Sequence, residues 1–168
     1  SLTSHEKPSI AVLPFDNMSG DSEQEYFSDG ITEDIITALS HLRWLNVIAR
    51  NSSFTYKGQS PDIRQVADEL NCRYVLEGSI RKAGNRVRIN AQLLEGLSGN
   101  HIWAEKYDRE LEDIFDLQDE ITEAVLGAIE PSLVLAEIER AKRKHPENMD
   151  AYDLFLQGLP GLYTFDIE

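Results

Sequence analysis

The sequence predicts a mixed α/β domain: a β-α-β start, an antiparallel meander and then a long helix, with about five strands and three main helices. Three observations support this α/β (α+β) fold class. An apolar run at residues 9–15 precedes a helical pattern and a second apolar run. Strand-like segments separated by short turns follow between residues 73 and 108. A helical stripe of apolar side chains then extends over residues 111–144.

The β-α-β unit begins with a buried strand. In Ser9–Phe15 nearly every side chain is apolar, which is typical of a strand covered on both faces. Residues Asp16–Glu23 form an acidic loop after it, and the helix that follows ends near His41. Leu45–Arg50 has the pattern of a second short strand. A strand, a crossover helix and a second strand predict a parallel pair.

The helix between these strands starts with Ser22 and Glu25 at the spacing of a capping box. Its buried face recurs at steps of three and four residues: Phe27, Ile31, Ile35, Ala38, Leu39 and Leu42. Gly30 lies within this pattern and costs about 1 kcal/mol relative to alanine. Close packing against the sheet would offset that cost, and a local break in the helix is the alternative.

The segment after the second strand, residues 51–60, has the composition of a loop. Ser60 is placed to cap a second helix, with Pro61 in its first turn. Asn71 is placed to end that helix. This short helix therefore connects the β-α-β unit to the meander.

The antiparallel meander has strands at 73–81, 86–94 and 101–108. The middle strand alternates apolar and polar residues, so one face of this part of the sheet should be solvated. Gly84 can supply positive φ in the first turn. The polar face gathers basic side chains: Arg81, Lys82, Arg86 and Arg88. They are either a contact for an upstream domain or a second copy, or a solvated strand face.

The long helical pattern at 111–144 contains Pro131, which should kink or break it. Basic residues at its end complement the negative end of the helix dipole. Residues 146–150 then have the composition of a linker, and residues 151–158 begin another helical pattern.

The composition is that of an acidic globular domain. Its 168 residues are 41% hydrophobic and carry a net charge of −14. Nucleic acids and anionic membranes attract basic proteins, so neither is expected as a partner. Cys72 is the only cysteine, which excludes an intrachain disulfide and suits the reducing cytoplasm. There is no signal peptide and no apolar run of about 18 residues, so we expect a cytoplasmic location.

Six segments occur in an order and spacing that resembles the TolB amino-terminal-like module. They are IAVLPFDNMSGD, EYFSDGITEDIITALS, VIARNSSFTYKG, RYVLEGSIRKAGNRVRINAQLLE, HIWAEKYDRELEDIFDLQDEIT and AYDLFLQG. Their exact residues most resemble the modules of bacterial class III adenylate cyclases with C-terminal tetratricopeptide repeats. The resemblance implies a TolB-like module over residues 8–145. It also implies a truncated first helical repeat over residues 146–168.

The resemblance also implies a place for the module between other domains. In this family an upstream effector domain, which is a class III cyclase, a winged-helix activator or a kinase, precedes the module, and the repeats follow it. Protein partners are then expected through the downstream repeats and at the upstream effector domain. Because class III cyclases act as dimers, a homodimer would suit this arrangement.

The residues that a class III cyclase uses are not found in this sequence. That reaction needs paired aspartates on two Mg²⁺ ions and cationic groups that stabilise the leaving pyrophosphate. We therefore expect no catalytic residues and no cofactor in this chain, with Mg²⁺ and ATP used only by a parent cyclase. The leading hypothesis is a non-catalytic regulatory or coupling module of an adenylate cyclase. The alternative is a sensory ligand-binding domain of a winged-helix transcription activator.

One candidate ligand site follows from the strand ends. Open α/β sheets bind ligands beyond the carboxyl ends of parallel strands. Asn17 from the acidic loop could therefore join residues that follow the second strand around a small polar pocket: Arg50, Ser52, Ser53 and Tyr56. The alternative is a structured connection whose hydroxyl groups satisfy the backbone.

The acidic loop could instead bind an ion. Its helix start suits a phosphate, but its carboxylates repel one. The same carboxylates are ligands that Ca²⁺ or Mg²⁺ prefers: Asp16, Asp21, Glu23, Glu25 and Asp29. They lack EF-hand spacing, so solvated charges at a helix N-terminus are the simpler interpretation, and we expect no metal site. Cys72 has no companion cysteine and is expected to be a buried structural thiol.

Overall fold

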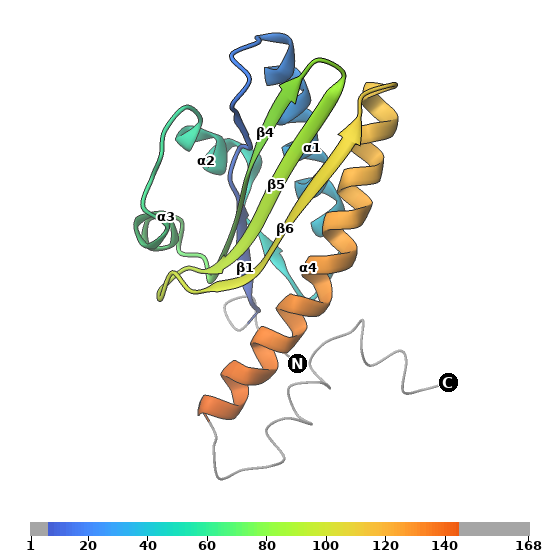
Figure 1. Cartoon of the computed structure of the whole chain (residues 1–168). Helices are drawn as coiled ribbons and strands as arrows, with labels where there is room; N and C mark the ends of the chain where they lie inside the picture. Colours follow the sequence, from blue (N-terminus) through green and yellow to red (C-terminus); the bar gives the residue numbers. More distant parts are fainter. Residues whose placement is uncertain (1–6, 145–168) are drawn as a thin grey trace, which may run out of the picture.

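The computed structural model describes residues 7–144 as a mixed six-stranded sheet with helices on its faces (Figure 1). The strands are β1 (Ser9–Val12), β2 (Asp16–Asn17), β3 (Asn46–Val47), β4 (Tyr74–Ala83), β5 (Arg86–Glu95) and β6 (His101–Glu110). The strand order is β3-β1-β4-β5-β6, and β2 pairs with β4 off this path. β1 is parallel to β3 and β4, whereas β4, β5 and β6 are antiparallel neighbours. The predicted fold class is confirmed.

Four α-helices and one 3-10 helix occur in the described residues: α1 (Glu23–Leu39), α2 (Arg50–Ser53), η1 (Phe54–Tyr56), α3 (Ile63–Leu70) and α4 (Ile114–Lys144). The sixth strand is β2, which takes up the start of the predicted acidic loop. Its residues pair in parallel with Ser79 and Ile80 of β4. The predicted linker at 146–150 and helix at 151–158 lie outside the described residues.

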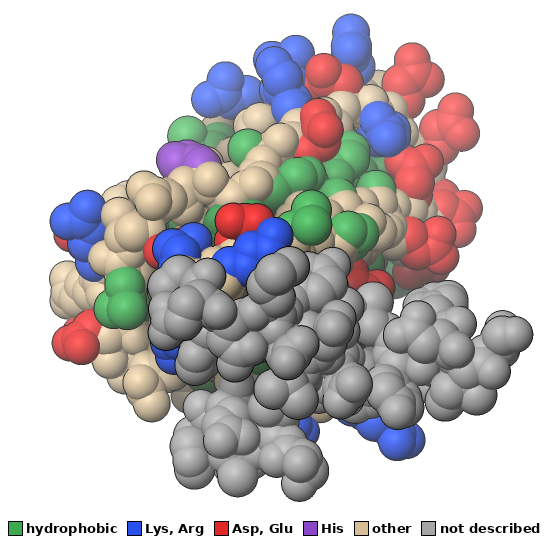
Figure 2. All heavy atoms as spheres, turned by 90° about the horizontal axis from the view of Figure 1, so that it is seen from below, with side chains coloured by type: hydrophobic (Ala, Val, Ile, Leu, Met, Phe, Trp, Pro, Cys, Tyr) green, Lys and Arg blue, Asp and Glu red, His purple; other side chains and the backbone are tan. Residues whose placement is uncertain are grey.

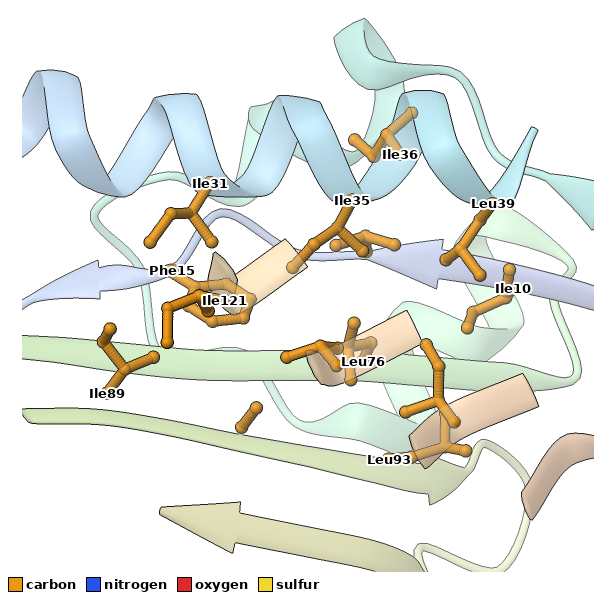
Figure 3. Packing of buried hydrophobic residues seen from close by; sticks show 14 of the residues in the cluster. Ile10, Phe15, Ile31, Ile35, Ile36, Leu39, Leu76, Ile89, Leu93 and Ile121 are labelled. Atoms are coloured by element: carbon orange, nitrogen blue, oxygen red, sulfur yellow. The ribbon is translucent and has the colours of Figure 1, made fainter. Parts of the chain in front are cut away.

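The main core lies between one face of the sheet and the helices α1 and α4. Phe27, Ile31, Ile35 and Leu39 of α1 are fully buried, as their helical spacing predicts. They pack against alternate residues of the central strands and against Ile121 of α4 (Figure 3). Burial of each large apolar side chain contributes about 1.5–3 kcal/mol. This layer is therefore the main hydrophobic contribution to stability.

A smaller apolar cluster lies on the opposite face of the sheet. Ala11 and Leu13 pack there with Val66 and Ala67 of α3. The alternate residues of β1 face the main core, so the first strand is buried on both faces, as predicted. Away from α3, this second face carries polar side chains of β4, β5 and β6. The solvated face that the alternation of β5 predicts is thereby confirmed.

A buried carboxylate joins the second half of α4 to the sheet. Glu137 is only 4% exposed. One of its oxygens accepts a hydrogen bond from Arg73 at 2.5 Å, and the other accepts one from the Tyr74 hydroxyl. Burial and the neighbouring Glu137 charge raise the pKa of Tyr74, which keeps its hydroxyl a donor. Because all three groups are paired, the charge is tolerated inside the protein.

The N-terminus of α1 differs from the prediction. Ser22 has helical backbone angles and makes no side-chain cap, so the predicted capping box with Glu25 is wrong. Instead, Asp21 Oδ1 accepts a hydrogen bond from the Glu23 N–H at 3.0 Å. An aspartate one residue earlier satisfies the free N–H group, and Ser22 then has no capping role.

Residues 51–60 are more ordered than the predicted loop, because α2 and η1 occupy most of this range. Asp62, and not Ser60, caps α3 by accepting a hydrogen bond from the backbone of the second helical residue. Pro61 consequently lies before the helix and not in its first turn. Asn71 ends the helix in a left-handed conformation with φ of 51°, as predicted.

Two further element boundaries differ from the prediction. β3 is shorter than the predicted strand Leu45–Arg50, because Arg50 already begins α2. α4 continues through Pro131 without the predicted break. Gly127 lies four residues earlier, where the proline ring meets the preceding turn, and its backbone is free to accommodate the ring.

Two glycines mark close approaches between elements. α1 is continuous at Gly30, where an added Cβ would lie 2.4 Å from Gln118 Nε2 of α4. The packing partner is therefore α4 and not the predicted sheet. An added Cβ at Gly78 would lie 2.4 Å from the Asn90 carbonyl oxygen and 2.5 Å from the Phe15 ring.

We expect Gly78→Ala to lower the free energy of unfolding by about 1–3 kcal/mol, because a backbone carbonyl and a packed ring must both move. Gly30→Ala is the matched control. There the obstacle is the end of a side chain, and alanine gains about 1 kcal/mol of helix propensity. Urea unfolding at neutral pH measures both changes. Equal losses in the two variants would contradict this interpretation.

Candidate functional site

A groove of about 720 Å³ lies on the polar face of the sheet. It begins at Leu13 and Pro14, just beyond the carboxyl end of β1, which is where open α/β sheets bind ligands. Small-molecule sites typically enclose about 300–1,000 Å³. The groove lies between three parts of the chain: the segment 13–18 after β1, the segment 56–61 before α3, and the polar face of β4, β5 and β6.

Polar side chains point into the groove from alternate positions of neighbouring strands. Glu77 and Ser79 of β4 lie opposite Gln92 and Asn90 of β5. Gln92 Nε2 donates to the Glu77 carboxylate, and Asn90 Nδ2 donates to Ser79 Oγ at 3.4 Å. Lys106 of β6 lies opposite Asn90. The groove thus presents carboxylate, amide, hydroxyl and ammonium groups together, which suits a small polar ligand.

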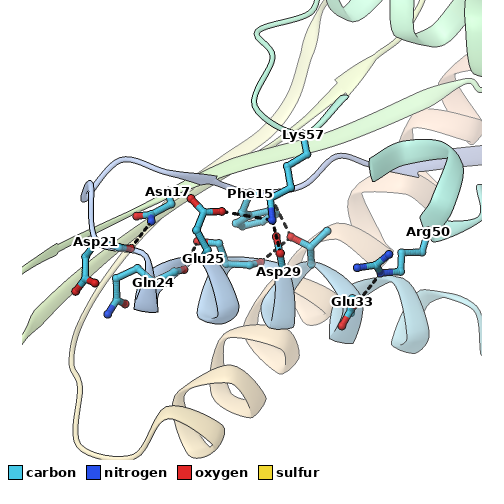
Figure 4. Close-up of polar contacts among 11 residues, drawn as sticks. Phe15, Asn17, Asp21, Gln24, Glu25, Asp29, Glu33, Arg50 and Lys57 are labelled. Carbon is cyan, nitrogen blue, oxygen red and sulfur yellow. Dashed lines mark hydrogen bonds and ion pairs between the residues drawn. The ribbon is translucent and has the colours of Figure 1, made fainter. Parts of the chain in front are cut away.

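Two cations hold the segment 50–57 against α1 (Figure 4). Arg50 pairs with Glu33, and Lys57 pairs with Asp29 and, at 3.4 Å, with Glu25. The three carboxylates lie four residues apart on α1, so they share one side of that helix. Exposed ion pairs contribute about 0–1 kcal/mol each, so the main effect of this set is to position the segment.

Tyr56 fixes the end of the same segment to α3. Its hydroxyl donates a hydrogen bond to the Glu69 carboxylate, and its ring packs against the smaller apolar cluster. Burial and this hydrogen bond raise the pKa of Tyr56 to about 12, and the bond lowers the pKa of Glu69. One wall of the groove is therefore held by α1 through the cations and by α3 through Tyr56.

Of the five predicted site residues, Tyr56 is the one that lines the groove. Asn17 serves the turn before α1: its amide donates to the Asp21 carbonyl at 2.7 Å, and its Oδ1 accepts from the Ser19 N–H at 3.0 Å. These bonds fix Asn17 within its own turn, and a ligand site that joins it to the segment after β3 remains a prediction.

The other three predicted residues, Arg50, Ser52 and Ser53, belong to α2. Arg50 faces Glu33 on α1. Ser53 is buried and donates to the Arg50 carbonyl at 3.1 Å, while the Ser52 carbonyl accepts from Thr55 Oγ1 at 2.7 Å. These bonds match the alternative of a structured connection, and ligand binding by this set remains a prediction.

The residues that form most of the groove were not predicted as a site. Asn90 and Gln92 carry the alternation that the sequence does show, but it predicts a solvated face and gives no sign of a neighbouring wall. Glu77 and Ser79 belong to a strand for which the sequence analysis predicts the bounds but not which side chains face the solvent. The signal that could have found them is register, because β4 pairs with β5 around the turn at Gly84.

The carboxylates that were considered as an alternative ion site have different roles in the structure. Asp16 lies in β2 and lines the groove, where burial and the charge of Glu25 raise its pKa. Asp21 serves the start of α1. Within residues 7–144 no group of three or more metal-ligating side chains gathers. On the face seen in Figure 2, acidic side chains gather mainly along one edge.

Cys72 is a buried structural thiol, as predicted. It is 6% exposed and packs in the smaller apolar cluster beside α3. Burial raises the pKa of Cys72 to about 11. The thiol therefore stays protonated at neutral pH, which disfavours a nucleophilic role.

The chain belongs to the HilA/YgeH-like transcriptional regulator family, as its second domain. The profile of that domain matches residues 5–124. A curated protein of Rhizobium meliloti (strain 1021), named "Putative adenylate cyclase 3", is 58% identical over 160 residues. The match covers 95% of this chain and 27% of that protein, so the chain spans only a minor part of this relative's length.

One solved structure shares the fold at low sequence identity, and a second is less similar. Lipoprotein GNA1162 from Neisseria meningitidis has a TM-score of 0.52 and 19% identity, with 74% of this chain and 98% of that chain covered. TolB from Acinetobacter baumannii has a TM-score of 0.49 and 17% identity, with 73% of this chain and 28% of that chain covered. Within residues 7–144, no helix has the length and apolarity that a membrane span requires.

The raised pKa of Cys72 predicts a loss of stability at alkaline pH. Between the ordinary thiol pKa of 9.0 and the folded value of about 11, the unfolded chain is ionised while the folded chain keeps its proton. The free energy of unfolding should therefore fall as pH rises, by about 2 kcal/mol from this group. Urea unfolding of wild type and Cys72→Ala from pH 8 to 11 measures it. Parallel pH curves for the two proteins would contradict the assignment.

Proposed function

We propose that this chain is a regulatory domain that performs no reaction itself and couples an upstream effector domain to a downstream helical repeat array. One observation carries the proposal. The chain belongs to a family of transcriptional regulator domains, yet it is 58% identical to part of a protein named as an adenylate cyclase. A domain that accompanies two different output reactions supplies neither of them. Transcription activation and cyclic nucleotide synthesis both have to be regulated, and a shared domain could supply that regulation.

The length of the relative supports separate regulatory and catalytic domains. The matched region is 27% of that protein, which leaves most of its chain for other domains. In the proposed arrangement a cyclase domain elsewhere in the parent protein binds ATP and Mg²⁺, and the whole protein is cytoplasmic. The repeats downstream of this domain would recruit the protein partners.

The groove gives such a domain a place to receive a signal. Its wall at residues 56–61 follows the segment that Lys57 and Arg50 hold against α1. A ligand that changes the position of this wall would change the contact with α1, and α1 packs directly against α4. An input on one face of the sheet could thereby reach the long helix on the other face.

A second candidate function is a sensory ligand-binding domain of a winged-helix transcription activator. The match to a transcriptional regulator family favours it. The two candidates use the same groove and the same helices, and they differ in the effector domain that is controlled. Assays of cyclic nucleotide synthesis and of DNA binding by the full-length protein distinguish them.

The isolated chain is expected to form no cyclic AMP or cyclic GMP from ATP or GTP with Mg²⁺ or Mn²⁺, because no group of three or more metal-ligating side chains gathers within residues 7–144. The full-length protein, assayed by the same chromatography, should form one of these products if its effector is a cyclase. Turnover by the isolated chain that is lost in Glu77→Gln would overturn the proposal.

Coupling is tested in the full-length protein with Lys57→Met. This change removes the ion pairs to Glu25 and Asp29 without touching the core. We expect the kcat of the effector to change several-fold at unchanged substrate KM, while Arg43→Met, an exposed residue in the turn after α1, leaves both constants unchanged. A domain that serves only as a tether would give wild-type kcat in both variants.

A further inference from the structure

A second groove, of about 520 Å³, lies between the second half of α4 and the turn that joins β5 to β6. α4 lines it with Ser132, Leu135 and Ala136, and β6 lines it with Ile102. Leu135 is 63% exposed, which is unusual for a leucine in the middle of a packed helix. Arg143, also part of the lining, lies 3.8 Å from Glu95 across the groove. The groove is therefore apolar along α4 and has charged residues beside it.

The chain continues from the end of this groove. α4 ends at Lys144, one residue beyond Arg143, and residues 145–168 follow. In that segment Tyr152, Phe155 and Leu156 occur at the spacing of one apolar helical face. A short amphipathic helix, which this spacing predicts, cannot bury such a face by itself.

The connection is long enough for a return to the groove. From Ser132 to Lys144, α4 rises about 18 Å at about 1.5 Å per residue. The polar residues 145–150 can span about 20 Å when extended, at about 3.3–3.6 Å per residue. The segment that follows them can thus reach every part of the groove along α4.

We propose that residues 151–158 of this same chain dock in the groove, with the apolar face around Phe155 against Leu135. Docking covers the exposed leucine and the apolar face of the segment in one step. It also sets the direction in which the chain leaves α4. Downstream domains would then be held at a fixed angle to the sheet and would not swing on a free linker.

Paired cysteines test the proposal in the full chain. Leu135→Cys with Phe155→Cys should form an intramolecular disulfide under mild oxidation. Lys144→Cys with Phe155→Cys is the matched control, because Lys144 lies outside the groove lining, is exposed like Leu135 and is closer to residue 155 along the chain. Native Cys72 is buried and does not compete. We expect the 135–155 pair to form the disulfide about tenfold more than the control, by mass spectrometry.

Each other outcome overturns the proposal. Equal yields in the two pairs mean that tethering alone brings the residues together. A disulfide-linked dimer on a non-reducing gel means that a second copy supplies the segment.

Thermal unfolding gives a second test. Leu135→Glu and Phe155→Ser should each lower the thermal midpoint, and the double variant should lose no more than the larger of the two single losses. Leu97→Glu, at another exposed leucine, should leave the midpoint unchanged. Additive effects of the first two changes contradict docking.

Discussion

The buried carboxylate of Glu137 is the constraint on which the arrangement of this domain depends. It lies on the inner side of α4, next to Arg73 and Tyr74 at the start of β4, and is bonded to both. An apolar contact would allow the helix to slide by a fraction of a turn. A buried charge with two directed partners does not, because any shift leaves an ion unpaired in an apolar surrounding, at a cost of about 3–5 kcal/mol.

Fixing α4 in this way places both grooves on one rigid unit. The first groove lies on the polar face of the sheet, and the second lies along α4, which continues past the end of the sheet (Figure 1). β4 connects the first groove to α4, since Glu77 of β4 lines that groove and Tyr74 of β4 is bonded to Glu137. In the proposed regulatory role, a signal at the first groove would be transmitted through these packed strands and helices.

Much of the fold could be predicted from the sequence, because it rests on local patterns. The alternation in β5, the apolar residues of β1 and the helical spacing from Phe27 to Leu39 each specify an element and its buried face. Element ends were predicted less well, because one polar residue competes with its neighbour for the same backbone group. Asp21 and Asp62 serve the helix starts where Ser22 and Ser60 were expected to act.

The candidate site was predicted only in part, because it depends on contacts between distant segments. Tyr56 follows from its place after a parallel strand, but Glu77 and Gln92 become neighbours only through the register of β4 and β5. The charge of Arg50 and Lys57 is visible in the sequence, whereas their use against α1 requires the carboxylates at positions 25, 29 and 33 to share one side of a helix. The role of Glu137 leaves no local sequence signal at all.

Amide hydrogen exchange over residues 130–144 measures whether Glu137 fixes α4 to the sheet. In Glu137→Gln the protection of this part of α4 should fall by more than about tenfold relative to wild type, since the Arg73 charge loses its partner. The protection of α1 should change much less. Glu139→Gln, an exposed neighbour on the same helix, should leave the wild-type pattern. Unchanged protection of α4 in Glu137→Gln would mean that the buried carboxylate does not fix the helix.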